Sequence, residues 1–129
     1  MSVVLDTWAV LRYLDGTDPA ATMVDELVAL ERPAMSWINV GEVHYVLRRA
    51  YGDLEAVATV RDLGDAVDLV SPVPASVTAA ARIKADHPMS YADAFAAALA
   101  VEREATLWTG DPELLIDDAP WSWRDLRSA

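Results

Sequence analysis

The segment that decides the fold is SYADAFAAALAVEREATLWTGDPEL, residues 90–114. Its first half is rich in alanine and predicts a helix from residue 92 to about residue 104. A short apolar strand follows over residues 106–108. A helix that leads directly into a buried strand is typical of α/β domains. Two aspartates stand out here, because Asp93 begins an otherwise apolar helix and Asp111 waits just beyond the next strand.

The same alternation of strands and helices continues through the rest of the chain. Strands are expected over residues 3–5, 34–37 and 67–70, and helices over residues 7–15, 20–31, 39–51, 54–63 and from Pro72–Pro74 to about 86. A short helix is expected from Pro112, and Trp121–Trp123 alternates like an edge strand. Trp37 and Trp108 are expected in inner strands. The pattern predicts one α/β domain over residues 1–129, with a mainly parallel central sheet flanked by helices.

Composition and charge limit the possible classes of protein. Hydrophobic residues make up 53% of the 129 residues, which indicates a folded chain rather than a disordered one. The absence of cysteine excludes disulfides, a thiolate nucleophile and a cysteine metal site. No signal peptide or membrane span is expected, so we predict a cytoplasmic protein. The net charge of −11 should repel a bare polyanion unless metal ions or arginines intervene, and should attract a basic protein.

Four carboxylates from separate elements are expected at one edge of the sheet. Asp6 ends the first strand and Asp111 follows the fourth, which places both at the carboxyl ends of parallel strands. Glu42 lies in the first turn of the helix after the second strand. The helix that Asp93 begins must run back against the strands, so its start lies at the same edge. Sites in such sheets form at this edge, where the strand order reverses.

A divalent cation would explain why these carboxylates are brought together. Each acid alone fits a helix cap, but capping does not explain four caps at one edge. Two carboxylates ~4 Å apart repel by ~4 kcal/mol at an effective dielectric of 20. Hard oxygen ligands suit one or two Mg²⁺ or Mn²⁺ ions, which can activate water for attack on a phosphodiester. The hydroxyls of Thr7 and Thr109 would orient a carboxylate or a metal-bound water, or else cap the backbone locally.

At this point the chain resembles a known family, the PIN-domain proteins, and is most similar to the VapC-type toxin ribonucleases of bacterial toxin–antitoxin pairs. Four motifs carry the resemblance, and they occur in the family's order across nearly the whole chain. They are Val4-Leu5-Asp6-Thr7, Asn39-Val40-Gly41-Glu42, Asp93-Ala94-Phe95-Ala96-Ala97-Ala98-Leu99-Ala100 and Thr109-Gly110-Asp111.

The resemblance implies a three-layer PIN-like fold and an endoribonuclease that depends on Mg²⁺ or Mn²⁺. It implies RNA as the substrate, a homodimer, and a cognate antitoxin that blocks the site. The implied catalytic and metal-binding set is Asp6, Glu42, Asp93 and Asp111, with Thr7 and Thr109 in support.

Two positions depart from the family pattern. Trp8 stands where the family usually has a small polar residue, and it would change the shape of the site's mouth. Glu113 stands where many members place another acid, which would assist the metal or simply favour the first turn of a helix. Possible contacts to RNA phosphates are Arg12, Arg48, Arg49 and Arg82, although Arg48 and Arg49 also fit compensation of a helix dipole.

Other classes fit the sequence less well. A haloacid-dehalogenase-like phosphatase needs an aspartate two positions after Asp6, where Trp8 stands instead. There is no glycine-rich phosphate loop, and His44 and His87 form no zinc pattern. Two alternatives remain open, which are a non-catalytic PIN-like binding module and a metal-dependent DNA nuclease.

Overall fold

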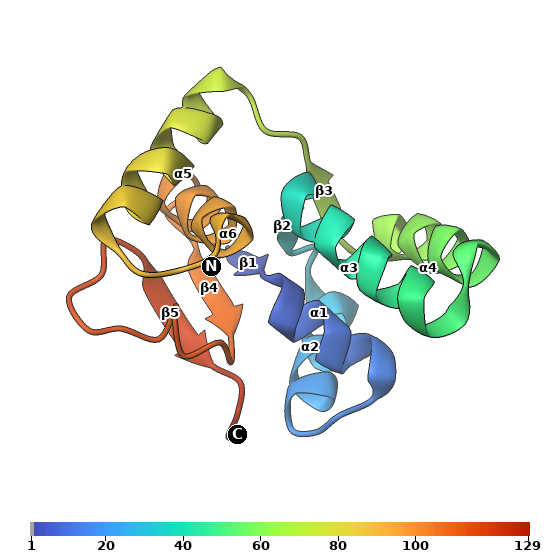
Figure 1. Ribbon diagram of the computed structural model, residues 1–129. Coiled ribbons are helices and arrows are strands. Elements are labelled where there is room, and N and C mark those ends of the chain that lie inside the picture. Colours follow the sequence, from blue (N-terminus) through green and yellow to red (C-terminus); the bar gives the residue numbers. More distant parts are fainter. Residues whose placement is uncertain (1) are drawn as a thin grey trace.

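A five-stranded parallel sheet lies at the centre of the structure, a computed structural model that describes residues 2–129 (Figure 1). The strands are β1 (Val3–Leu5), β2 (Ala34–Ser36), β3 (Asp68–Val70), β4 (Thr106–Thr109) and β5 (Ser122–Asp125). Their order across the sheet is β3-β2-β1-β4-β5, and every described pair is parallel. The predicted parallel sheet is confirmed, and the C-terminal segment does form its edge strand.

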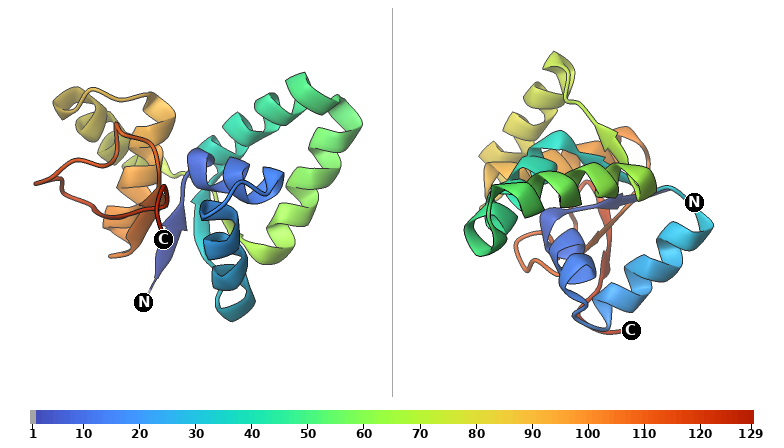
Figure 2. Two further views of the ribbon diagram at one scale, coloured as in Figure 1. Left: turned by 90° about the horizontal axis from the view of Figure 1, so that it is seen from below. Right: turned by 90° about the vertical axis from the view of Figure 1, so that its right-hand side faces the viewer.

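Helices cover both faces of this sheet. They are α1 (Thr7–Asp15), α2 (Ala20–Leu30), α3 (Trp37–Tyr51), α4 (Asp53–Ala66), α5 (Pro74–Asp86) and α6 (Tyr91–Glu102). In the left view of Figure 2, β1 lies between a layer that holds α5, α6 and the C-terminal segment and a layer that holds α1 to α4. This is the expected three-layer arrangement. Among residues 2–129, no helix is long and apolar enough to cross a bilayer.

The strands divide the core into two halves because successive side chains point to opposite faces of a sheet. In β1, Val3 and Leu5 pack with α1 to α4, whereas Val4 packs with α5 and α6. In β4, Trp108 faces the first group of helices and Leu107 the second. All five side chains are buried. Both faces of the inner strands are therefore dry, which explains why these strands are apolar runs without polar alternation.

Helix α6 is buried along most of its length, as the alanine-rich segment suggested. Every residue from Asp93 to Ala100 is buried. Small side chains allow this helix to lie close to the sheet on one side and to α5 on the other. The helix ends two residues earlier than predicted because Glu104 takes a left-handed conformation with φ 51, and the N–H of Ala105 donates to the carbonyl of Ala100 over 2.9 Å.

Two local predictions were wrong. The helix expected from Asn39 begins at Trp37, because the Ser36 hydroxyl oxygen accepts from the Ile38 N–H and caps it. Trp37 is therefore not in an inner strand, and 43% of its surface is exposed. Pro112 starts no helix, since the segment after β4 is a turn closed by a 2.9 Å bond from the Leu114 N–H to the Asp111 carbonyl.

The strand order reverses between β1 and β4. From β1 the chain moves outward through β2 to β3, and it then crosses back to place β4 and β5 on the other side. The loops that follow β1 and β4 therefore leave in different directions and open a crevice at the carboxyl ends of these strands. The fold places the candidate site there.

The two-sided core predicts a large cost for truncating an inner strand. Replacing the fully buried Leu107 with alanine should lower the free energy of unfolding by about 2–5 kcal/mol, because it loses apolar burial and leaves a cavity. The same change at Leu30, which is 87% exposed, should cost less than about 0.5 kcal/mol. Urea denaturation of both variants measures the difference, and equal costs would contradict this description of the core.

Candidate active site

The carboxylate of Asp6 joins the ends of β1 and β4. Asp6 is 1% exposed and precedes α1 as its N-cap. The Ala9 N–H donates to its Oδ1 over 2.8 Å, and the Thr109 hydroxyl donates to its Oδ2. The capping role expected from the sequence is real. It uses one carboxylate oxygen, while the other is bound by a residue 103 positions away.

Thr109 is the centre of this small network. Its hydroxyl oxygen, which donates to Asp6, also accepts from the Asp111 N–H over 3.0 Å. The Asp111 carboxylate then accepts from the Glu113 N–H over 3.0 Å and closes the turn. One buried hydroxyl thus fixes Asp6 and the backbone of Asp111 relative to each other, which is the supporting role expected for Thr109.

Asp93 is not engaged in the capping box that its position suggested. The Ser90 hydroxyl oxygen accepts from the Asp93 N–H over 3.1 Å, as expected. The reciprocal bond is different, because the Ser90 N–H donates to the carboxylate of Glu113 over 3.1 Å. Glu113 therefore takes the place of Asp93 as the side chain that caps the start of α6. Asp93 is buried, with 7% of its surface exposed.

The acids affect one another's ionisation. The pKa of Asp6 is raised to about 7, mainly by burial and also by the nearby charges of Asp111 and Glu42, while the bonds from Thr109 and Ala9 oppose the rise. Glu42 is partly exposed in the first turns of α3. As predicted, α3 therefore lies close to the end of β1.

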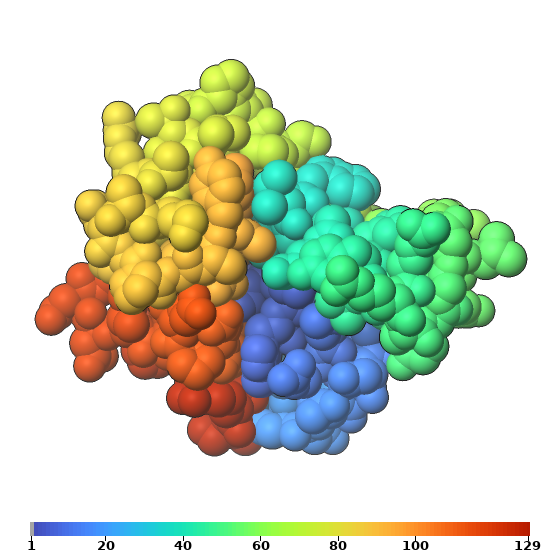
Figure 3. All heavy atoms as spheres, in the orientation of Figure 1, coloured from blue at the N-terminus to red at the C-terminus, as the bar shows by residue number. Residues whose placement is uncertain are grey.

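Asp93 has the larger shift. Its pKa is raised to about 8, first by burial, then by a hydrogen bond with the Asp111 carboxyl and by the charges of Asp111, Asp6 and Glu113. Asp6, Asp93 and Asp111 thus lie within electrostatic reach of one another, and Glu42 lies within reach of Asp6, at the edge that the topology predicted. In Figure 3 the segments of α1, α3 and α6 meet near the middle of one face.

Asn39 is a site residue that the sequence did not reveal. It is fully buried, and its Nδ2 donates to the Thr7 hydroxyl oxygen over 3.2 Å and to the Ala92 carbonyl over 3.1 Å. The Thr7 hydroxyl donates in turn to the Asn39 carbonyl over 3.4 Å. One amide therefore ties the first turns of α1, α3 and α6 together. The sequence held one hint of this role, because Asn39 lies four residues before Val43 and therefore on the same, buried face of α3.

Thr7 consequently has a different partner from the one expected. Its hydroxyl contacts Asn39 and not a carboxylate. Within residues 2–129, the Asn39 Oδ1 is a buried oxygen with no hydrogen-bond donor. A buried acceptor of this kind is costly unless a further group satisfies it.

The donor set fits a hard divalent cation. The side chains that meet here offer carboxylate and hydroxyl oxygens, which are the ligands such cations prefer. Over the described part of the chain, no three Asp, Glu or His side chains are already in a ligating arrangement. Burial and neighbouring carboxylates raise the pKa of Asp6 and Asp93, and within residues 2–129 no arginine or lysine forms an ion pair with either. A cation would supply the missing positive charge.

Trp8 packs directly against the loop between Thr109 and Asp111. A Cβ atom on Gly110 would lie 2.3 Å from the nearest atom of the Trp8 ring, so only glycine allows this contact. One helical turn later, the guanidinium of Arg12 lies over the same ring, with its Cζ 4.4 Å from the ring centre. Trp8 therefore forms part of the edge of the site, and its effect on the shape of the site's mouth stays a prediction.

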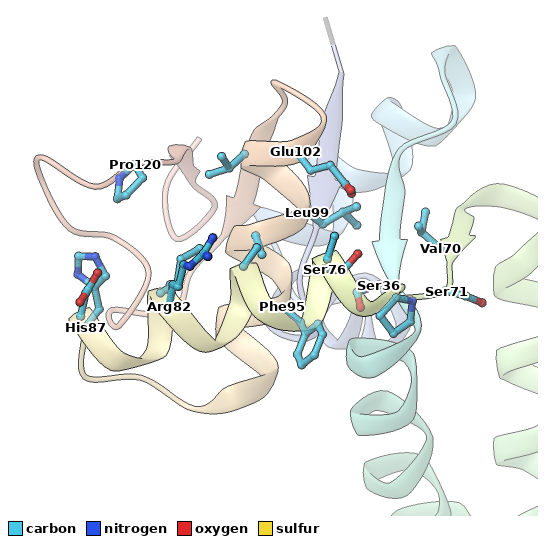
Figure 4. Close-up of a pocket in the computed structure, with 17 residues that line it drawn as sticks. Ser36, Val70, Ser71, Ser76, Arg82, His87, Phe95, Leu99, Glu102 and Pro120 are labelled. Atoms are coloured by element: carbon cyan, nitrogen blue, oxygen red, sulfur yellow. The ribbon is translucent and has the colours of Figure 1, made fainter.

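The other predicted RNA contacts lie in different surroundings. Arg48 pairs with Asp53 on the surface at 3.4 Å, and Arg49 lies over the ring of Tyr45 at 5.0 Å. Arg82 lines a mainly apolar cavity of about 380 Å³ between α5 and α6. In Figure 4, Arg82 lies along α5 near His87, and none of the four acids lines this cavity. Of the four arginines, Arg12 is connected to the acidic site through a described contact.

Comparison with known proteins gives a family and a fold. Residues 3–118 match the family model described as PIN domain. No curated protein sequence matches the chain.

Solved structures share the architecture at low sequence identity. VapBC2 from Rickettsia felis, bound to a promoter DNA fragment, superposes with a TM-score of 0.77 at 14% identity, covering 97% of this chain and 98% of that one. VapBC-1 from nontypeable Haemophilus influenzae gives 0.76 at 20% identity, covering 99% and 100%. VapC20 from Mycobacterium tuberculosis, described as a Sarcin-Ricin loop cleaving toxin, gives 0.71 at 20% identity, covering 88% and 92%.

The raised pKa values predict that the metal-free protein loses stability as the pH rises. The unfolded chain releases these protons near pH 4, whereas folded Asp6 and Asp93 hold them to about pH 7 and 8. Stability should be full below about pH 4 and fall towards pH 8, by at most ~1.4 kcal/mol per pH unit for each group. Asp6→Asn should make this decline shallower, as measured by urea unfolding in EDTA from pH 5 to 8.

The control for this experiment is an exposed aspartate outside the site. Asp25→Asn on α2 removes one carboxylate with little change in burial, so it should keep the wild-type slope. Identical slopes for Asp6→Asn and wild type would show that burial of Asp6 does not govern its ionisation.

The contact between Trp8 and Gly110 predicts strong coupling between these positions. Gly110→Ala should cost about 1–3 kcal/mol, because the new methyl group meets the ring. In a Trp8→Ala background the same change should cost little. Gly41→Ala is the control, since a Cβ there meets nothing within 4 Å and helix propensity favours alanine. A double-mutant cycle by urea denaturation measures the coupling, and additive effects would contradict the contact.

Proposed function

The chain belongs to the PIN domain family, and we propose on this premise that it is a divalent-metal-dependent endoribonuclease, the toxin of a toxin–antitoxin pair. The family and the fold shared with VapBC structures support a nuclease of the toxin–antitoxin type. The observation that carries the proposal is the group of carboxylates at the β1–β4 crevice. Burial and mutual repulsion raise the pKa of Asp6 and Asp93 there, and within residues 2–129 no arginine or lysine pairs with either acid.

The residues that would hold one or two Mg²⁺ or Mn²⁺ ions are Asp6, Glu42, Asp93 and Asp111. When bound, such an ion lowers the pKa of a water molecule and neutralises charge on a phosphodiester. Thr109 and the Ala9 N–H fix the two oxygens of Asp6. Burial and the neighbouring carboxylates raise the pKa of Asp93 to about 8, so a cation held there would compete with a proton for this carboxylate. Cation binding should therefore tighten as the pH rises.

Supporting residues keep this set in place. Asn39 holds the first turns of α1 and α6 at a fixed spacing through its bonds to Thr7 and Ala92. Glu113 holds the start of α6 through the Ser90 N–H. Neither needs to touch a metal ion to act in this way. Such outer contacts around metal ligands typically change affinity or activity 10- to 100-fold when removed.

RNA is the proposed substrate. Among structural relatives, the Mycobacterium tuberculosis protein is described as cleaving the Sarcin-Ricin loop. Arg12, Arg48, Arg49 and Arg82 remain the proposed phosphate contacts, with Arg12 beside the site. A metal-dependent DNA nuclease would use the same carboxylates, so the two nucleic acids must be compared directly.

Two protein partners are also proposed. A cognate antitoxin is supported by the VapBC relatives and by the net charge of −11, which favours a basic partner. A homodimer is supported by exposed apolar residues such as Val73 just before α5, Val77 on α5 and Tyr91 on α6. The cytoplasmic location stays a prediction.

Cleavage by purified variants tests the proposed activity. Wild type should cleave a structured RNA in Mn²⁺ or Mg²⁺ and not in EDTA. Asp6→Asn and Asp93→Asn should each lose at least about 100-fold in rate, since direct ligands matter no less than the groups around them. Asp25→Asn should cleave like wild type. Retained cleavage in both site variants would refute the assignment of these residues.

The same assay separates the alternatives. Faster cleavage of DNA than of an RNA of matched sequence would indicate a DNA nuclease. Metal binding without cleavage of either, measured by calorimetry with Mn²⁺, would indicate a binding module that keeps the fold alone.

A further inference from the structure

The ring of Trp8 is held at the rim of the acidic site. Gly110, which it contacts, lies between Thr109 and Asp111, and Trp8 itself follows Asp6 by two residues. Gly110 does not have a positive φ, so its backbone conformation alone does not require glycine. Glycine is required instead because the Trp8 ring lies too close for a Cβ atom. Trp8 is only partly buried against the core that α1 to α4 form, so part of its side chain is exposed.

Arg12 lies beside this surface, and its guanidinium forms no ion pair with a carboxylate among the described residues. Its guanidinium lies over the Trp8 ring at 4.4 Å. Through residues 2–129, no carboxylate oxygen lies within 4 Å of it, although the chain has 21 acidic residues. Arg48, Arg61, Arg103 and Arg127 each have such a partner, whereas Arg32, Arg49, Arg82 and Arg124 share with Arg12 the lack of one among the described residues. Arg12 differs from these four in its contact with Trp8, two residues after Asp6. Arg12 therefore keeps its full charge for an external anion.

Geometry and charge together select the kind of ligand. A basic protein segment would be repelled by Arg12, whereas a phosphate would be attracted by it and repelled by the acids further in. Flat π-surfaces and guanidinium planes are the groups on which proteins stack unpaired bases. A single-stranded nucleic acid offers both a base and a phosphate to this pair of side chains.

We propose that Trp8 and Arg12 form a nucleotide subsite at the rim of the acidic site, which stacks one base of single-stranded RNA and contacts its flanking phosphate. The inference rests on the proposed function, because it places the RNA strand for cleavage. It assigns stacking to the indole and guanidinium planes and phosphate binding to Arg12. Gly110 keeps the indole in position.

Binding of two matched probes tests the subsite. One probe is a fluorescein-labelled, 12-nucleotide single-stranded RNA, and the other has the same ribose-phosphate backbone without bases. An Asp93→Asn background limits cleavage in every sample, and fluorescence anisotropy gives each Kd. Trp8→Ala should weaken binding of the base-bearing probe about 10-fold and leave the abasic probe within about twofold.

Arginine variants separate charge from stacking. Arg12→Ala should weaken both probes and lower the slope of log K against log salt by about 0.7, the value for one phosphate contact on a single strand. Arg61→Ala on α4 is the charge control and should change neither probe. Trp8→Phe, which keeps an aromatic plane, should retain most of the affinity that Trp8→Ala loses.

Several outcomes would overturn the subsite. Equal losses on both probes with Trp8→Ala would mean that the ring only supports the loop. No change in either probe with Arg12→Ala would remove the phosphate contact and leave the pair as a protein contact or a packing feature. If Trp8→Ala does not fold, Trp8→Phe and Arg12→Ala decide. If the wild-type protein does not cleave RNA but the variants change binding of the two probes as expected, the proposed nuclease activity is refuted and the subsite is not.

Discussion

The buried bond between the Thr109 hydroxyl and the Asp6 carboxylate is the contact on which the site depends. It links the ends of two adjacent parallel strands, β1 and β4, that are about 100 residues apart in the chain. Because the strand order reverses there, no crossover connection covers the space above them. The same bond partly offsets the burial of Asp6, whose pKa is still raised to about 7. The sheet topology therefore creates the crevice and brings into it carboxylates whose mutual repulsion a cation would relieve.

Several contacts around the acids prevent the helices that carry or flank them from moving apart to relieve the repulsion. Mutual repulsion would push α1 and α6 apart, but the Asn39 amide bonds to both of their first turns. Glu113 anchors the start of α6 from the loop beyond β4. Trp8 presses against the same loop at Gly110, where no larger residue fits. These contacts hold the backbone around the acids in place, so only side-chain rotations would be needed to bring the carboxylates together around a cation.

Charge distribution reconciles an acidic protein with an anionic substrate. A net charge of −11 opposes RNA at long range, so productive contacts must be local. Metal ions would neutralise the inner carboxylates, and Arg12 supplies positive charge at the rim. The acidic surface outside this crevice is suited to a basic antitoxin. The acidic charge over most of the surface therefore favours the proposed basic antitoxin, while Arg12 and bound metal ions would favour the proposed RNA substrate at the crevice.

The sequence by itself determined the elements and the edge at which the acids gather, because helix and strand periodicity are local and parallel strands share one carboxyl edge. It placed Asp6, Glu42, Asp93 and Asp111 correctly at that edge. It misplaced Trp37 and the turn at Pro112, where the Ser36 cap and a closed turn prevail over propensity. Tertiary structure alone decided the bridging by Asn39, the capping of Ser90 by Glu113 and the contact of Trp8 with Gly110. Each joins residues that only the packed sheet and helices bring within a few ångströms.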